Sequence, residues 1–331
     1  MSILLTSPLI KTALRSGRKL WQAAFGRGTA LERFLRWHYD AMTWRTRGAP
    51  RYALFSAGSN PSNRVGIFMK GGCDLPAVFA CEPLIRQVLN GTCCMMLEGT
   101  AADSRTDLLL QTRRELPKEW IDPVIKKLKL RDDYFQSQLF EKNIILPGKN
   151  GLQEFPKSAV ILSVGADLGG RSLYAHREHG FLVDPGGWWL NQNLNEVLND
   201  LSGAKWFREN FVSVGRSSLE AFVENLTEIV KLLKNDTSAP ILVFNALTVD
   251  PGSTVHNYQF IKYHHTMGRR AFNIALKDLS RKLDFSIVDV DRVLKKAGVN
   301  AQLDFAHFPA ELYPPVAQET FRIMKDLGVF S

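Results

Sequence analysis

Several short apolar runs of this chain end in glycines followed by residues able to carry out nucleophilic or acid–base chemistry. A thiol and a carboxyl follow one such run, a second carboxyl follows another, and near the C-terminus a carboxyl and an imidazole stand three residues apart. These are the groups from which nucleophiles and general bases are made. The residues concerned are Gly72, Cys73, Asp74, Gly99, Asp167, Asp304 and His307.

The apolar runs predict five buried strands. They cover 65–69, 93–97, 159–164, 241–244 and 285–290, and helical patterns stand between them. Alternating strands and helices predict a parallel sheet covered on both faces, a flavodoxin-like three-layer αβα sandwich. In such a sheet, ligands bind at the carboxyl ends of the strands, so we expect the residues after the strands to gather there.

The helices are predicted from spacing and from terminal residues. Pro76 opens a helix towards Leu89, a charged helical stretch covers about 104–143, and Pro314-Pro315 opens a last helix that reaches about Leu327. The clearest helix runs over 217–234, where Ser217 and Glu220 form a capping box. Another helix is predicted over 271–283.

The order of strand ends resembles that of the SGNH (GDSL-type) hydrolases. In that family Gly-x-Ser follows the first strand, glycine the second and Gly-x-Asn the third, and Asp-x-x-His precedes the last helix. Here Gly71-Gly72-Cys73-Asp74-Leu75, Gly99, Gly165-Ala166-Asp167 and Asp304-Phe305-Ala306-His307 stand in the same order. The resemblance covers roughly residues 62–331.

The resemblance implies acyl transfer. His307 would be the general base, Asp304 would orient it, and Cys73 would stand where the family has serine. The backbone around Gly72 and Cys73, the Gly99 N–H and residue 167 would hold the oxyanion. A thiol near an imidazole, at the start of a helix, is expected to have a lowered pKa.

Two departures from the family pattern leave alternatives open. With a shift of one residue, Gly72-Cys73-Asp74-Leu75 aligns with Gly-Asp-Ser-Leu, which puts Asp74 at the nucleophile position. Asp167 stands where the family has asparagine, and an ionised carboxylate accepts hydrogen bonds instead of donating them to an oxyanion. The two substitutions together also fit a module without catalytic activity.

A long insert over 166–210 is rich in Gly, Trp, His and Arg, as is typical of a binding wall. Arg171 and Arg177 are candidate clamps for a carboxylate or phosphate of the substrate, and His179 is a further substrate-binding candidate. His176 and His179 are spaced like metal ligands, but no third ligand stands at a telling spacing. We therefore expect neither a metal nor a cofactor.

Positive charge is concentrated at the N-terminus. Residues 1–51 contain ten of the 42 Lys and Arg residues but only two of the 33 acids, so nearly all of the net charge of +9 lies there. An amphipathic helix over 9–25 and a second aromatic, Arg-containing stretch over 31–45 fit docking on an anionic membrane surface or an acidic carrier protein. Packing on the body and a cleaved transit peptide are the alternatives. The nearly neutral remainder argues against nucleic-acid binding.

The sequence thus predicts a basic helical extension over 1–60 and an SGNH-like domain over 61–331. The four cysteines have no zinc spacing and fit reduced thiols of a cytoplasmic protein, peripheral at the membrane if the extension docks there. The functional hypothesis is a hydrolase or acyltransferase acting on an ester or thioester of a polar substrate such as a glycan or glycolipid. The alternative is an inactive module that binds a glycan or a protein partner.

Overall fold

The structure is a computed structural model. It describes residues 49–72, 74–99, 105–128, 130–148, 151–163, 165–168, 172–185, 201–248, 266–298 and 307–331, together with Ser16 and Leu20. Cys73, Arg171 and Asp304 lie outside these ranges. So do the helices expected over 9–25 and 31–45, except for Ser16 and Leu20, which are both helical and exposed.

Five parallel strands form the centre of the molecule. They are β2 (Arg64–Lys70), β3 (Gly91–Glu98), β5 (Gly151–Ser163), β9 (Ile241–Phe244) and β10 (Ser286–Val288), in the spatial order β3-β2-β5-β9-β10. In chain order this is 2-1-3-4-5, the order of flavodoxin-like sheets, whose switch point lies between the first and third strands. The predicted fold class is confirmed.

Two further strands lengthen the sheet beyond the prediction. β1 (Arg51–Ala57) pairs antiparallel with β3 at the edge, and β4 (Asn143–Gly148) forms an antiparallel hairpin with the first half of β5. Residues 51–57 were expected in the N-terminal extension but belong to the sheet. The charged stretch at 104–143, expected to be helical, contains helices over 106–111 and 118–128. Its described residues over 130–142 form no helix, and Asn143 begins β4.

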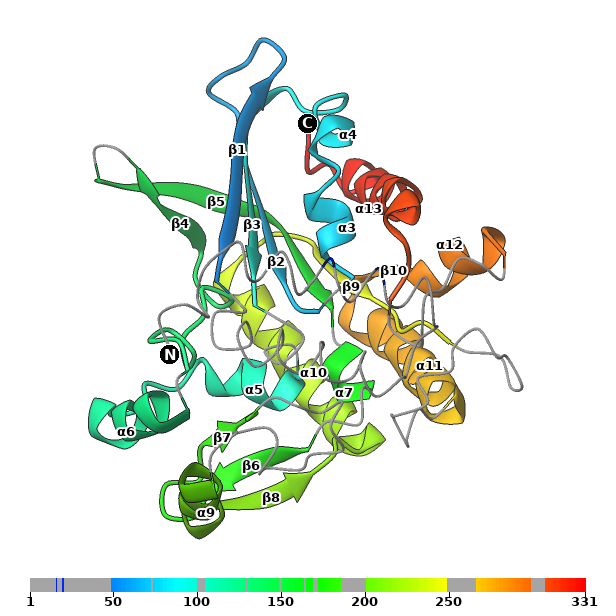
Figure 1. The fold of residues 1–331 in the computed structure, drawn as a ribbon. Coiled ribbons are helices and arrows are strands. Elements are labelled where there is room, and N and C mark those ends of the chain that lie inside the picture. Colours follow the sequence, from blue (N-terminus) through cyan, green and yellow to red (C-terminus); the bar gives the residue numbers. More distant parts are fainter. Residues whose placement is uncertain are drawn as a thin grey trace.

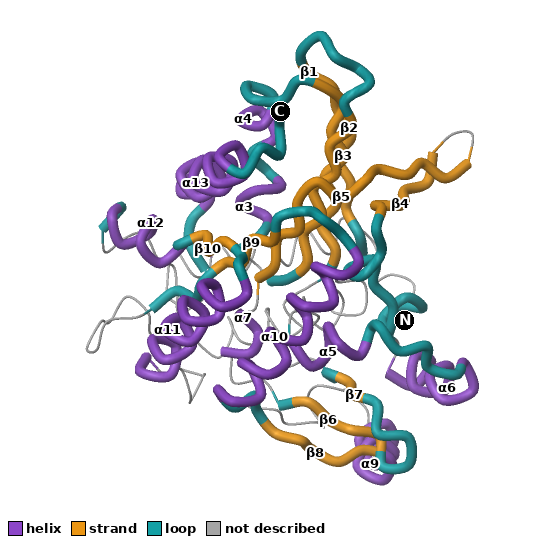
Figure 2. The backbone as a smooth tube through the Cα atoms, turned by 180° about the vertical axis from the view of Figure 1, so that it is seen from behind, coloured by secondary structure: helices purple, strands orange, loops and turns teal. Residues whose placement is uncertain are grey.

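Helices cover both faces of the sheet (Figures 1 and 2). Four helices pack on the face that carries Ile67 of β2, and three pack on the face that carries Phe68. The first group is α3 (Pro76–Phe79), α4 (Glu82–Ile85), α12 (Val290–Lys296) and α13 (Tyr313–Asp326); the second is α5 (Thr106–Gln111), α10 (Leu219–Asp236) and α11 (Thr266–Leu283).

Side chains that alternate along each strand serve the two cores. On β3, Cys93 faces the core with α13 and Cys94 faces the core with α10, and both are fully buried. Burial raises the pKa of both thiols, that of Cys94 to about 12. A strand buried on both faces needs apolar residues throughout, which is why these runs were visible in the sequence.

The helix boundaries are set by local capping and by proline. The N-cap of α10 is Ser218, one residue later than predicted, and its hydroxyl accepts from the Ala221 N–H at 3.1 Å. The last helix, α13, begins at Tyr313 with its two prolines in the first turn, as predicted. The helix predicted from Pro76 to Leu89 is broken at Ala80 and Cys81 into α3 and α4.

A small second sheet lies on the side of the carboxyl ends of the central strands (Figure 1). It consists of β6 (Leu173–His176), β7 (Leu182–Val183) and β8 (Phe211–Gly215), all paired antiparallel. Together with α6 (Lys118–Leu128) and α9 (Leu201–Asn210), it encloses a separate aromatic core. The predicted insert therefore contains regular structure of its own.

Within the described ranges, no helix is both long and apolar enough to cross a membrane.

Candidate functional site

The turn after β2 lies against the end of β5, at the switch point of the sheet. Gly71 has a φ of +150°, and a Cβ added there would lie 2.6 Å from the Ser163 carbonyl oxygen. Its N–H also approaches the carbonyl oxygen of Glu98 at 3.4 Å, which joins the turn to the end of β3. Only glycine fits at this position, and the close approach brings the ends of three strands together.

Asp74 directly follows Cys73, and its side chain is described by the structure. The Ser163 hydroxyl donates to its Oδ2 at 2.8 Å, and the Leu75 N–H donates to its Oδ1 at 3.1 Å. Ser163 is itself buried, at 1% exposure. Two donors from different segments therefore fix the carboxyl group in one orientation.

His307 lies close enough to Asp74 for their charges to interact. Burial raises the pKa of the Asp74 carboxyl, whereas the hydrogen bond from Ser163, the local backbone N–H groups and the charge of His307 each lower it. An acid and a base far apart in the sequence thus lie within electrostatic range of each other at the switch point. Asp74 is one of the two residues that the alternative alignments place at the nucleophile position.

Cys73 and Asp304, the other two members of the predicted catalytic set, lie outside the described residues. Their neighbours bracket the site, because Gly72 and Asp74 flank Cys73 and His307 follows Asp304 by three residues. Gly99, at the end of β3, has a φ of +93° that favours glycine.

The Asp167 side chain turns to α5. It comes from the short helix α7 (Gly165–Leu168), and its two oxygens accept from the backbone N–H and the hydroxyl of Thr106, at 3.0 and 2.9 Å. Burial, followed by the nearby Asp107 carboxylate, raises the pKa of Asp167 to about 7, against the opposing effect of the Thr106 hydrogen bonds and of Arg105. In this arrangement Asp167 is an acceptor, the opposite of the oxyanion donor that the family has at this position.

The residues directly before Gly71 and Gly99, Lys70 and Glu98, form a buried ion pair. Lys70 Nζ lies 3.1 Å from Glu98 Oε2, and the Glu98 carboxylate also accepts from the Gln138 N–H at 3.1 Å and from the Ser137 hydroxyl. The Lys157 ammonium donates to the backbone of the same loop, reaching the Leu139 carbonyl at 2.8 Å. Burial, opposed by nearby carboxylates, lowers the pKa of Lys157 to about 8. The sequence analysis did not identify this network.

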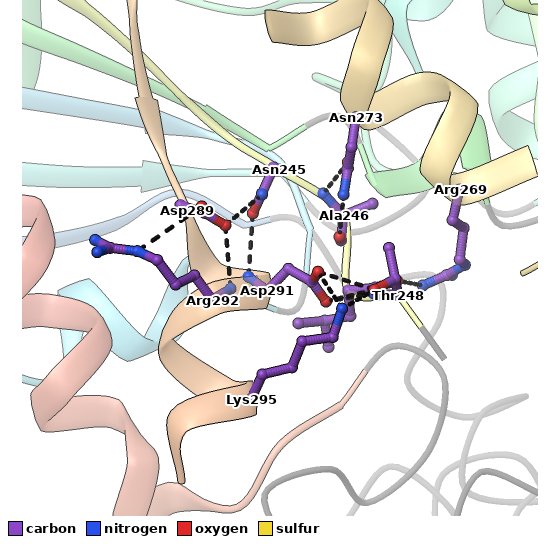
Figure 3. Close-up of polar contacts among 10 residues, drawn as sticks. Asn245, Ala246, Thr248, Arg269, Asn273, Asp289, Asp291, Arg292 and Lys295 are labelled. Atoms are coloured by element: carbon purple, nitrogen blue, oxygen red, sulfur yellow. Dashed lines mark hydrogen bonds and ion pairs between the residues drawn. The ribbon is translucent and has the colours of Figure 1, made fainter. Parts of the chain in front are cut away.

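A second polar cluster follows β9 and β10 at the same edge of the sheet (Figure 3). The Asn245 side chain donates to Asp289 at 2.7 Å, and Asp291 accepts from the Thr248 N–H at 2.7 Å and from its hydroxyl. Lys295 donates to Asp291 at 2.8 Å.

The backbone between these residues is held from α11. The Asn273 amide bonds both the N–H and the carbonyl of Ala246, at 3.0 and 2.8 Å, and Arg269 donates to the Leu247 carbonyl at 2.8 Å. Side chains from α11 and from α12 with its N-cap Asp289 therefore fix the four residues after β9. Asn245 and Asp289 directly follow strands four and five, so the strand-end rule also covers this cluster.

The two histidines of the insert belong to a stack of rings over the small sheet. Trp120 stacks on His179 with centroids 4.2 Å apart, and His179 stacks on His176 at 4.8 Å with 5° between the ring planes. Phe181 continues the stack on His176 at 4.9 Å. Lone pairs of parallel, stacked imidazoles lie in separate planes and do not converge on one ion. No group of three or more potential metal ligands occurs among the described residues.

Arg177 also makes its described contacts within this region. Its side chain donates to the Arg208 carbonyl at 3.3 Å, and its N–H donates to the Asn210 carbonyl at 2.8 Å. Arg177 is exposed, whereas His179 is partly buried. The substrate contacts expected of Arg177 and His179 remain predictions.

Comparison with known proteins gives a likeness in structure only. No protein-family model matches the chain, and no curated protein matches it. Among solved structures, a member of the lipolytic G-D-S-L family from Veillonella parvula is 9% identical, with a TM-score of 0.39, over 79% of this chain and 98% of its own.

Two further structures are similar to the same degree. A catalytic mutant of an acetylxylan esterase from Geobacillus stearothermophilus is 10% identical, with a TM-score of 0.38, over 82% of this chain and 96% of its own. A lipase/acylhydrolase from Enterococcus faecalis is 10% identical, with a TM-score of 0.42, over 80% and 96%. The first of these three proteins belongs to the G-D-S-L class that the sequence resembles.

Proposed function

We propose that this chain is a hydrolase or acyltransferase acting on an ester or thioester of a polar substrate such as a glycan or glycolipid. Cys73 is the nucleophile, His307 the general base, and Asp304 the carboxylate that orients it. The proposal rests chiefly on one observation: the charge of His307 acts on the half-buried carboxyl of Asp74, the residue directly after Cys73, which Ser163 holds at the switch point of the sheet. Ligands bind at this place in open parallel sheets.

In the proposed reaction, His307 takes the proton of the Cys73 thiol as the sulfur attacks the carbonyl carbon. The tetrahedral oxyanion collapses to an acyl-thioester, and the leaving oxygen, or the leaving sulfur of a thioester substrate, receives the proton held by His307. Water or an acceptor hydroxyl then attacks the carbonyl carbon of the acyl-enzyme and gives its proton to His307. The bond from that carbon to the Cys73 sulfur breaks, and the sulfur takes the proton back from His307. An ionised Asp74 beside the imidazole stabilises the cation formed in each proton transfer.

Backbone N–H groups at Gly72, Cys73 and Gly99 are the proposed oxyanion donors. Asp167, with both oxygens accepting from Thr106, contributes no donor in this arrangement. Loss of one oxyanion donor typically lowers a rate by about a hundred- to a thousand-fold. We therefore expect slow turnover of simple esters. Arg171, Arg177 and His179 of the insert are the proposed substrate contacts.

A second candidate function, binding without catalysis, is favoured by the hydrogen bonds of Asp74. Ser163 and Leu75 hold its carboxyl in place within electrostatic range of His307, and the shifted alignment puts Asp74 at the nucleophile position. A carboxyl occupying that position would pair with the imidazole and leave no activated thiol.

Alkylation of each cysteine by iodoacetamide, measured against pH by mass spectrometry, separates the two candidates. In an enzyme, Cys73 reacts fastest, and its apparent pKa lies well below the value of about 8.5 for a free thiol. His307→Ala then raises that pKa. Buried Cys93 and Cys94 provide internal references in every sample. If Cys73 titrates as an ordinary thiol with and without His307, the chain is a binding module.

The basic N-terminal segment is proposed to dock the protein, located in the cytoplasm, on an anionic membrane surface. Leu20 supports this, because it is helical and 72% exposed instead of packed on the body. Since β1 begins at Arg51, a deletion of residues 2–48 spares the sheet. The truncated protein is expected to lose sedimentation with phosphatidylserine vesicles. Unchanged sedimentation would rule out membrane docking and leave an acidic carrier protein as the occupant to be tested.

A further inference from the structure

Asp167 joins two short helices, α7 and α5, that are far apart in the sequence. Its carboxyl comes from α7, which follows β5, and it accepts both hydrogen bonds from Thr106, the first residue of α5. Asp167 is 4% exposed and Thr106 is fully buried. The start of α5 has no side-chain cap of its own, so Asp167 satisfies one of its free N–H groups from another segment.

The start of α5 is fixed from other elements as well. The Asn225 amide of α10 donates to the Thr106 hydroxyl at 3.3 Å. Arg105 donates to the Gly215 carbonyl of β8 at 3.2 Å and pairs with Asp107 at 2.5 Å. A segment held by α7, α10 and β8 together has little freedom to move relative to the sheet.

We infer that Asp167 is a positioning residue, whose hydrogen bonds to Thr106 hold the start of α5 in register with α7. Its consequence for turnover rests on the proposed function. Thr106 lies seven residues after Gly99, and Asp167 lies four residues after Ser163, which holds Asp74. The contact thus spans the two sides of the proposed oxyanion site.

Asp167 stands where the family that the sequence resembles has an oxyanion donor. Here its proposed role is to hold the start of α5 in place through its hydrogen bonds to Thr106. A misplacement of about 1 Å in a catalytic arrangement can cost about a hundred-fold in rate. Breaking the contact is expected to impair the oxyanion side of the site and to leave the thiol and its base intact.

Two pairs of variants test this inference. Asp167→Ala and Thr106→Val remove the contact. Asp167→Asn and Thr106→Ser retain it, because an asparagine oxygen still accepts from the Thr106 N–H while its amide donates to the hydroxyl, and serine keeps both donors. Thr112→Val is the matched control: it removes a hydroxyl bond to Leu109 at the other end of the same helix.

Hydrogen exchange and the turnover of p-nitrophenyl acetate are measured together. For Asp167→Ala and Thr106→Val, we expect faster exchange confined to peptides spanning 105–112 and 165–168. We also expect kcat to fall about ten- to a hundred-fold, with little change in KM and in the alkylation rate of Cys73. Asp167→Asn, Thr106→Ser and Thr112→Val should resemble the wild type.

Three results would overturn the inference: unchanged local exchange in Asp167→Ala and Thr106→Val, the same exchange pattern in Thr112→Val, or a loss of kcat in Asp167→Asn despite retained protection. The last result would show that the carboxyl acts in the reaction itself. If the wild type fails to hydrolyse the ester, the proposed function fails, and the exchange pattern alone decides the positioning role. If Asp167→Ala does not fold, the Thr106 pair decides.

Discussion

Two aspartates that follow neighbouring strands at the same edge of the sheet, Asp74 half-buried and Asp167 buried, have different surroundings. Asp74, after β2, shares its carboxyl between Ser163 and the local backbone and faces a titratable base, His307. Asp167, after β5, is enclosed by α5, and both of its oxygens are engaged by Thr106. Burial is the largest effect raising the pKa of both groups.

The comparison indicates that a carboxyl's neighbours, more than its burial, decide its use. A carboxyl beside an imidazole can exchange protons and stabilise a cation, so Asp74 belongs to the chemistry of the site. Both oxygens of Asp167 accept hydrogen bonds from Thr106, so this carboxyl stabilises the backbone at the start of α5.

Replacing His307 is expected to have the largest effect. Removal of a catalytic base typically costs a thousand-fold or more, so His307→Ala should lower kcat for p-nitrophenyl acetate by about a thousand-fold or more. A urea unfolding curve checks that the variant is folded. A loss below about ten-fold would show that His307 is not the base.

The stability of the protein is expected to depend on the charge of Asp167. Its folded pKa of about 7 lies above the value of about 3.9 for an unfolded aspartate. Between these values Asp167 binds more proton in the folded chain than in the unfolded chain. The contribution of Asp167 to the free energy of unfolding is therefore fully present below the unfolded pKa and is lost as the pH rises through the folded pKa of about 7. Asp167→Asn should remove this dependence, amounting to a few kcal/mol, as measured by the urea midpoint between pH 5 and 8. Parallel profiles of the two proteins would contradict it.

The close approach of the two turns is tested at Gly71. Gly71→Ala places a Cβ 2.6 Å from the Ser163 carbonyl oxygen and should destabilise the fold by roughly 1–3 kcal/mol. Gly180→Ala is the control, since Gly180 also has a positive φ, +71°, but nothing lies within 4 Å of an added Cβ. Equal losses of thermal stability would show that backbone strain, not the close approach, accounts for the cost.

A smaller effect distinguishes the neighbours of Asp74. Ser163 lowers its pKa more than His307 does, so Ser163→Ala should raise the carboxyl pKa further than His307→Ala. Carbon-13 NMR of labelled aspartate measures both shifts. The opposite ranking would make the imidazole the main influence on Asp74.

The central fold could be predicted because its strands are buried on both faces and so appear as continuous apolar runs. β1 could not, since Phe55 is the single buried residue among its seven, so it contains no continuous apolar run. The break between α3 and α4 has no clear sequence signal apart from Pro83, the second residue of α4.

The site could be predicted only in part. The strand-end rule identified Asp74 and His307, which the structure brings together. Ser163 was missed because it lies inside an apolar run, as its last buried residue. The contact between Asp167 and Thr106 joins residues 61 positions apart and depends on how α5 and α7 pack, which no local pattern encodes.

The two cysteines of β3 allow the opening of the sheet around this strand to be measured. Cys93 and Cys94 face opposite cores and are fully buried, whereas Cys81 lies nearer the surface, between α3 and α4. A thiol reagent can reach the pair only when β3 separates from its neighbours. Their modification rates in the native protein therefore report the free energy of opening the sheet, one from each side.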